Sequence, residues 1–172
     1  MKNLVFLFAL LVSYSVIGQG KLQTETFNMT AYKANQAVQL LDAIPDDKFS
    51  WTPQDGVRSF ASVYAHIISA NYFFGSKLGA TPPAELNFQT LEQDIKTKED
   101  VKKYLQPSFD AALEAMKNTP DETLNDPVEY PFPGEYTKTT TILLILSHAN
   151  EHLGQLIAYS RMNEITPPWS AP

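Results

Sequence analysis

The chain has 172 residues, enough for one domain with a substantial hydrophobic core. Its 19 acidic residues outnumber its 13 basic residues, and the resulting net charge of −6 argues against nucleic acid as a partner. The sequence contains no cysteine, which excludes disulfide bonds, thiolate metal ligands and a cysteine nucleophile.

Residues 1–18 have the pattern of a secretory signal peptide. Lys2 supplies a positive charge, the apolar segment LVFLFALLVSYSVI follows, and Gly18 is a small residue at the expected cleavage point. The apolar segment is shorter than the roughly 17–25 residues that span a bilayer, which favours a cleaved peptide over a membrane anchor. Residues 19–172 are therefore predicted to form one exported domain, periplasmic or secreted, with no stable membrane anchor after processing.

The first predicted helix runs from about residue 22 to residue 44 and ends before Pro45. Apolar side chains recur along it with a period of about 3.6 residues: Phe27, Tyr32 (or Ala31), Ala34, Val38, Leu41 and Ile44. The segment after it contains two prolines and a glycine, which predicts a loop. Phe49 and Trp51 indicate that this loop packs against the rest of the domain.

Ser59 is a good N-cap for a second helix, which is expected to end near Gly79. A long, proline-containing connection follows. Thr97 and Asp100 form a variant of the capping box at the start of a third helix, from about residue 98 to residue 118. Pro107 lies inside this helix and is expected to kink it.

The next connection, residues 119–138, contains four prolines and is predicted to be irregular, with a short extended piece at residues 128–130. A fourth helix is predicted from about residue 139 to residue 163, before Pro167 and Pro168. The expected fold class is therefore all-α: a four-helix bundle with long connections between helices two and three and between helices three and four. Several aromatic residues are candidates for the core or for the wall of an apolar pocket, and their helical spacing favours the core: Trp51, Phe60, Tyr72, Phe73, Phe74 and Trp169.

The sequence contains three histidines, and their positions predict one metal site. His148 and His152 are four residues apart in the last helix, so their side chains lie on one face with Cβ atoms about 5–6 Å apart. His66 lies in the second helix and can face them. Three neutral nitrogen ligands with a coordination position left open are typical of a catalytic zinc-type site. A single helical histidine is more simply a half-buried polar residue, but the arrangement of all three favours metal binding.

The segment from His148 to His152 also matches H-x-x-E-H, the signature of a class of zinc proteases in which the glutamate, here Glu151, is the general base. Such a protease needs an acidic third ligand downstream, and Glu164 is the only acidic residue that follows. Glu164 lies about three turns farther along the same helix and cannot reach the same ion. The protease scaffold is also much larger, so this interpretation is disfavoured.

Two further polar residues of the last helix are candidates for a catalytic role. Glu151 lies about 60° from the histidine stripe, where it could transfer a proton or could be a solvated surface carboxylate. Gln155 faces the site more squarely and could bond to a metal-bound water or line a polar interior. Metal-bound histidines also need an acceptor for their second ring nitrogen, and the nearby candidates are Ser62, Ser69 and Asn71.

The segments WTPQDGVRSFASVYAHIISANYFF and HANEHLGQLIAYSRMNEITPPWS resemble the DinB-like superfamily of metal-binding four-helix bundles. The resemblance covers essentially the whole mature chain, and its most specific part is the closing motif H-x-x-E-H-x-G-Q. It implies that His66, His148 and His152 bind a divalent metal ion, typically zinc or nickel, with water completing the coordination. Some relatives are thiol transferases or isomerases that use a low-molecular-weight thiol.

Two functions are therefore expected. The first is an exported metal-dependent enzyme with a small-molecule substrate, either a transferase acting with a low-molecular-weight thiol or a hydrolase, with Glu151 and Gln155 as catalytic candidates. The alternative is a non-enzymatic periplasmic bundle that binds a metal or a small molecule. A homodimer is compatible with both.

Overall fold

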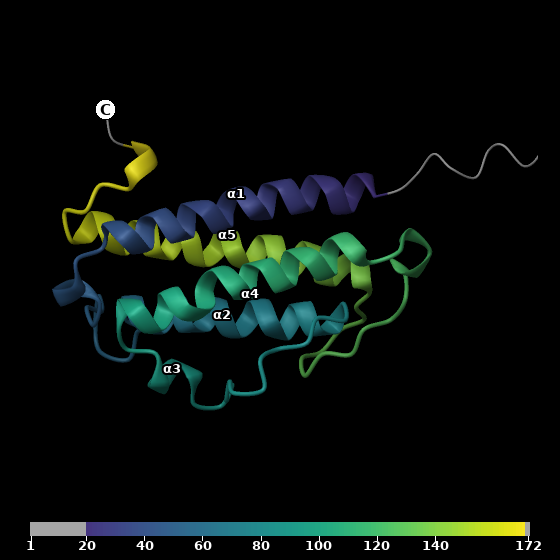
Figure 1. Cartoon of the computed structure of the whole chain (residues 1–172), viewed down its shortest axis with the longest axis horizontal. Helices are drawn as coiled ribbons and strands as arrows, with labels where there is room; N and C mark the ends of the chain where they lie inside the picture. Colours follow the sequence, from purple (N-terminus) through teal and green to yellow (C-terminus); the bar gives the residue numbers. More distant parts are fainter. Residues whose placement is uncertain (1–19, 171–172) are drawn as a thin grey trace, which may run out of the picture.

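The computed structural model describes residues 20–170 and is helical throughout. The predicted signal peptide, residues 1–18, lies outside the described residues. Four long helices form the bundle, and short helical turns lie in the connections (Figure 1). The long helices are α1 (Lys21–Ala43), α2 (Phe60–Lys77), α4 (Lys98–Asn118) and α5 (Lys138–Met162). The short elements are η1 (Asp46–Lys48), α3 (Leu91–Asp94), η2 (Asp121–Thr123) and η3 (Pro168–Ser170).

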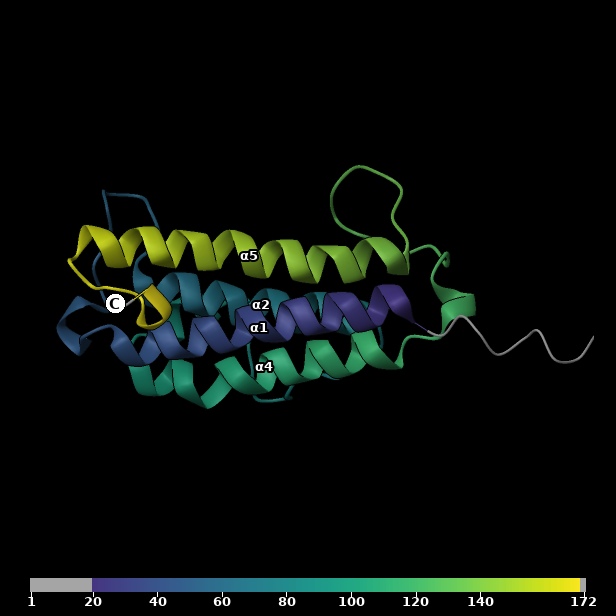
Figure 2. The same ribbon diagram turned by 90° about the horizontal axis from the view of Figure 1, so that it is seen from above.

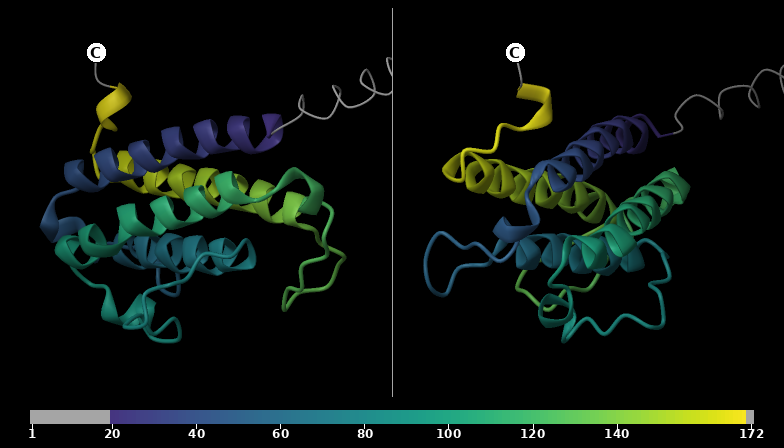
Figure 3. Two further views of the ribbon diagram at one scale, coloured as in Figure 1. Left: turned by 45° about the vertical axis from the view of Figure 1, so that its right-hand side comes forward. Right: turned by 60° about the vertical axis from the view of Figure 1, so that its left-hand side comes forward.

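Both α1 and α2 pack mainly against α4 and α5. Two views at right angles show this four-membered arrangement, with α5 beside α2 (Figures 1 and 2). The connection that carries α3 crosses the outside of α2, and the connection from α4 to α5 forms a projecting loop (Figure 3). The predicted four-helix bundle with two long connections is confirmed. The packing places α5 next to α2. These are the two helices that carry the histidines.

Local capping explains why the helices begin where the sequence predicts. The Ser59 hydroxyl accepts a hydrogen bond from the Ser62 backbone N–H at 3.2 Å. Thr97 and Asp100 form the predicted capping box at the start of α4. A second capping box, between Thr137 and Thr140, starts α5 within two residues of the predicted position.

The core is built from fully buried aromatic and aliphatic side chains of all four long helices, among them Leu40, Tyr64, Phe109 and Ile145. Tyr64 donates its hydroxyl hydrogen to the Ala37 carbonyl at 3.1 Å, so this buried polar atom is satisfied. Burying this much apolar surface supplies most of the stability of such a bundle.

Two local expectations need correction. Tyr32, predicted as an alternative to Ala31 for the buried stripe of the first helix, is 57% exposed, because the stripe that faces α4 and α5 passes through Ala34 and Leu41. Phe73, expected in the core, is 37% exposed. The short extended piece predicted at residues 128–130 directly follows an isolated bridge between Pro127 and Thr137, and the Val128 N–H bonds to the Tyr136 carbonyl. Phe49 is buried, as predicted for its loop.

None of the helices in residues 20–170 combines the length and the apolar character needed to cross a membrane.

Candidate metal centre

The three histidines converge between α2 and α5. Each offers one ring nitrogen, and these three atoms lie within 4.8 Å of one another. The Nε2 atoms of His66 and His148 are 3.1 Å apart, and the ring centroids of His148 and His152 are 4.3 Å apart. The spacing along α5 brings two histidines to one face, and the packing of α2 against α5 adds the third.

The ring nitrogens that point away from this centre have different partners. His66 Nδ1 lies 3.3 Å from Glu92 Oε1, and Arg58 donates two hydrogen bonds of 3.0 Å to the same carboxylate. His152 Nδ1 lies 2.9 Å from Gln155 Oε1, while Gln155 donates its amide hydrogen to the Tyr159 hydroxyl at 2.9 Å. In the tautomer that donates from Nδ1 to the Gln155 oxygen, His152 keeps the lone pair of Nε2 free for a metal ion.

His148 differs from the other two, because its Nδ1 atom is buried and has no hydrogen-bond partner in the part of the chain that the structure describes. Burial is the largest cause of a pKa of about 3 for His148, and the neighbouring His152, His66 and Arg58 contribute to this lowering in that order. Burial is also the largest cause of the lowered pKa of His66, where the nearby Glu92 acts in the opposite direction. Both rings are therefore neutral near pH 7, as a metal ligand must be.

This donor set fits a divalent transition-metal ion. Within residues 20–170 the cluster of potential ligands consists of the three imidazoles and includes neither a carboxylate nor a thiolate. Imidazole suits zinc, copper, iron and nickel, and three protein ligands leave a coordination position for water or substrate. His152 is buried, whereas His66 and His148 are half-buried, so the centre lies near the protein surface.

The structure brings one of the two catalytic candidates into the hydrogen-bond network of the site. Gln155 forms a hydrogen bond with the Nδ1 atom of His152, which is one of the three candidate ligands. Glu151 is exposed on α5, so its catalytic role stays a prediction. Glu164 lies in the turn that follows α5 and is not part of the cluster.

The acceptor for His66 is a residue that the sequence analysis missed. Two of the residues considered for this role bond elsewhere: the Ser62 hydroxyl lies 3.2 Å from the Ser59 hydroxyl, and Asn71 donates to Ser108 Oγ at 3.0 Å. Glu92 takes the role instead and comes from α3, within the long connection between α2 and α4. The apolar residues Leu91 and Ile95 in this connection were the sequence feature that indicated packing against the bundle, and both side chains are buried.

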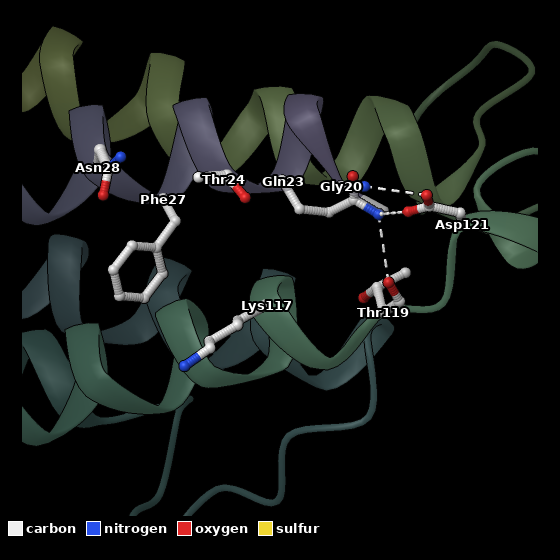
Figure 4. A pocket seen from close by; sticks show the side chains of 8 residues that line it. All are labelled: Gly20, Gln23, Thr24, Phe27, Asn28, Lys117, Thr119 and Asp121. Carbon is white, nitrogen blue, oxygen red and sulfur yellow. Dashed lines mark hydrogen bonds between the residues drawn. The ribbon is translucent and has the colours of Figure 1, made fainter. Parts of the chain in front are cut away.

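A separate cavity of about 450 Å³, which none of the three histidines lines, lies between the start of α1 and the end of α4. Gln23 closes one end of it by donating to the Thr119 carbonyl at 3.2 Å and to Asp121 Oδ1 at 2.7 Å (Figure 4). Phe27 and Lys117 line the other end. These contacts join the start of α1 to the segment that follows α4.

The family model of the DinB superfamily matches residues 32–156, a span that contains all three histidines. The chain belongs to the DinB superfamily. This membership and the histidine cluster agree with the resemblance seen in the sequence.

Three solved structures share the DinB-type fold of this chain. A DinB-like protein from Bacillus cereus is 19% identical, with a TM-score of 0.67 over 80% of this chain and 90% of that one. A DinB-like protein from Bacillus subtilis is also 19% identical, with a TM-score of 0.64 over 83% and 93%. A conserved protein from Enterococcus faecalis is 13% identical, with a TM-score of 0.66 over 83% and 97%. No curated protein is significantly similar in sequence to this chain.

Proposed function

We propose that this DinB-superfamily protein is an exported metalloenzyme. In this proposal His66, His148 and His152 hold one divalent cation, zinc or nickel, and the open coordination position receives a small-molecule substrate. The observation that carries the proposal is the convergence of three imidazoles to within 4.8 Å without a fourth ligand from residues 20–170. A structural zinc site would be closed by four protein ligands.

The proposed reaction is transfer to or from a low-molecular-weight thiol, or hydrolysis. A divalent ion held by three neutral ligands keeps its Lewis acidity and lowers the pKa of a thiol or of water. Glu92 and Gln155 orient His66 and His152 by accepting their Nδ1 protons. Glu151, one turn along α5 from His148, is the candidate for carrying a proton between the site and the solvent.

The alternative is a non-enzymatic bundle whose metal or small molecule is bound but not transformed. The two possibilities differ in whether the metal ion keeps an exchangeable ligand. Elemental analysis of protein purified without an affinity column would identify the native metal. Absorption spectra of the Co²⁺-substituted protein would then show whether an added thiol enters the coordination sphere. Four protein ligands and no response to thiols would favour the non-enzymatic alternative.

Export is proposed from the sequence of residues 1–18. The mature protein is then expected to begin at or near Gln19 and to be found outside the cytoplasm without a membrane anchor. Mass spectrometry of the N-terminus in each cell fraction tests this directly. Full-length protein with an intact Met1 in the membrane fraction would favour an uncleaved anchor.

A further inference from the structure

A group of aromatic rings lies beside the candidate metal centre. Phe73 and Phe74 of α2 meet Tyr130, Phe132 and Tyr136 of the connection from α4 to α5, and we call these five residues the aromatic cluster. Tyr130 is central: its ring centroid lies 4.8 Å from that of Phe132, 5.2 Å from Tyr136, 5.9 Å from Phe73 and 6.0 Å from Phe74. Such separations are those of favourable stacked and edge-to-face pairs.

The cluster reaches the metal ligands through Phe74. The ring of Phe74 meets that of His148 edge-on, with centroids 5.7 Å apart. A second link runs through Tyr130, whose hydroxyl lies 2.8 Å from Thr141 Oγ1. Thr141 precedes His148 by seven residues, or two helical turns, and so lies on the same side of α5. The aromatic cluster is therefore in direct contact with the histidine site through Phe74.

The loop that carries three of these rings is held in shape. The Val128 N–H donates to the Tyr136 carbonyl at 2.9 Å, which closes the loop at its base. The Tyr136 hydroxyl donates to the Pro133 carbonyl at 2.6 Å. Gly134 has a φ of 139°, and a side chain there would fall on the Tyr136 hydroxyl. A compact loop packed by its own side chains is often a functional element, and the rings are positioned before any ligand arrives.

Two of the rings are left open to solvent. Phe132 is 39% exposed and Phe73 is 37% exposed, while Phe74 and Tyr130 are half-buried. Single exposed apolar residues are common on protein surfaces and need no explanation. A group of exposed aromatic residues next to a polar centre is instead typical of a ligand site. Phe73 and Phe132 belong to neither of the two hydrophobic core clusters of the bundle, so their exposed rings are not explained by packing of the core.

We propose that the aromatic cluster binds a planar aromatic group of the substrate, whose reacting end lies at the three histidines. This inference rests on the proposed metal site and adds the chemical class of the non-reacting part of the substrate. The exposed parts of Phe73 and Phe132 can receive a further aromatic ring stacked or edge-on. A saturated ring of the same size lacks the quadrupole that favours these arrangements. Phe74 and Tyr130 contact the bound group closest to the metal, and Phe132 covers its far end.

The experiment compares thiols on the Co²⁺-loaded protein, with dissociation constants taken from the change in the cobalt absorption bands. Phenylmethanethiol is expected to bind about fivefold more tightly than cyclohexylmethanethiol, which matches the usual contribution of an aromatic pair beyond buried area. Tyr130→Leu and Phe132→Ala should each bring this ratio close to one while leaving the affinity for ethanethiol unchanged. Tyr32→Leu is the matched control, because it removes an exposed tyrosine of α1 and should keep the ratio.

The outcomes separate this inference from the proposal on which it rests. Failure to bind Co²⁺ or any thiol would overturn the proposed metal site. Normal Co²⁺ and ethanethiol binding, with equal affinities for the two ring-bearing thiols, would overturn the aromatic inference alone. Thermal unfolding of each variant shows whether it is folded, and Phe132→Ala changes a side chain exposed enough to keep the test valid if Tyr130→Leu is unstable.

Discussion

Glu92 joins His66 to Arg58: its carboxylate lies 3.3 Å from His66 Nδ1 and accepts both hydrogen bonds of the guanidinium group, each 3.0 Å long. Three separate segments meet here, namely the end of the loop before α2, α2 itself and the short helix α3. A carboxylate behind a ligand imidazole fixes the orientation of the ring and makes it a stronger donor. The connection between α2 and α4 is therefore part of the candidate metal centre.

Replacing this carboxylate should weaken metal binding without unfolding the protein. Glu92→Gln is expected to lower the affinity for Zn²⁺ by about 10–100-fold, because the amide cannot orient His66 or hold Arg58 in the same way. Competition with a chromophoric chelator measures the change. Glu122→Gln, which neutralises an exposed glutamate of η2, is the control and should leave the affinity unaltered. Equal affinities for the two variants would show that Glu92 only forms a surface ion pair.

Loss of a ligand should separate metal binding from folding. His148→Ala is expected to abolish Zn²⁺ binding at micromolar protein, while circular dichroism and thermal unfolding of the metal-free protein remain close to those of the parent. Each buried Leu or Ile contributes about 1.5–3 kcal/mol, so the core outweighs one metal ion. A bundle that melts when a chelator is added would instead identify the metal as structural.

The exposed carboxylate of Glu151 is predicted to affect rate rather than metal affinity. Glu151→Gln should leave the Zn²⁺ affinity within about tenfold of the parent and should depress kcat for a thiol or ester substrate, as expected of a proton carrier. Glu25→Gln, on the exposed face of α1, is the matched control. If kcat is the same in both variants, Glu151 is a solvated surface residue.

The capping box of α4 predicts a pH dependence of stability. Hydrogen bonds from the Thr97 hydroxyl and backbone hold the pKa of the Asp100 carboxyl below its usual value. The stabilisation is therefore fully present above about pH 4 and is lost as the pH falls through the lowered pKa of the folded state. Asp100→Asn should reduce the free energy of unfolding at pH 7 by less than about 1 kcal/mol, because solvent screens this exposed group.

Urea unfolding at pH 7 and at acidic pH measures this effect. The difference between Asp100→Asn and the parent should shrink as the pH falls below 4, whereas Asp55→Asn, in an exposed turn, should show no such trend. A difference that stays constant with pH would mean that the ionised carboxylate does not contribute to the cap.

The sequence by itself determined the four long helices and two of the three histidine ligands, because both depend on short-range chemistry. Caps such as Ser59 and the Thr97–Asp100 box act over three residues, so helix starts can be predicted without knowledge of the packing. The spacing of His148 and His152 places them on one face of any helix. That His66 joins this pair was predicted from its helical position and from the family resemblance, but four helices can be arranged in several ways, so the packing of α2 against α5 decided it.

Only the tertiary structure decided which groups support the histidines and which aromatic faces remain open. Glu92 meets His66 because α3 is anchored against α2 by buried side chains, a contact between residues 26 positions apart with no local pattern. Phe73 has the helical spacing of a core residue, yet it lies on the side of α2 that faces the projecting loop. Helical periodicity shows which residues share a face, but the neighbour that covers that face is set by the packing of distant segments.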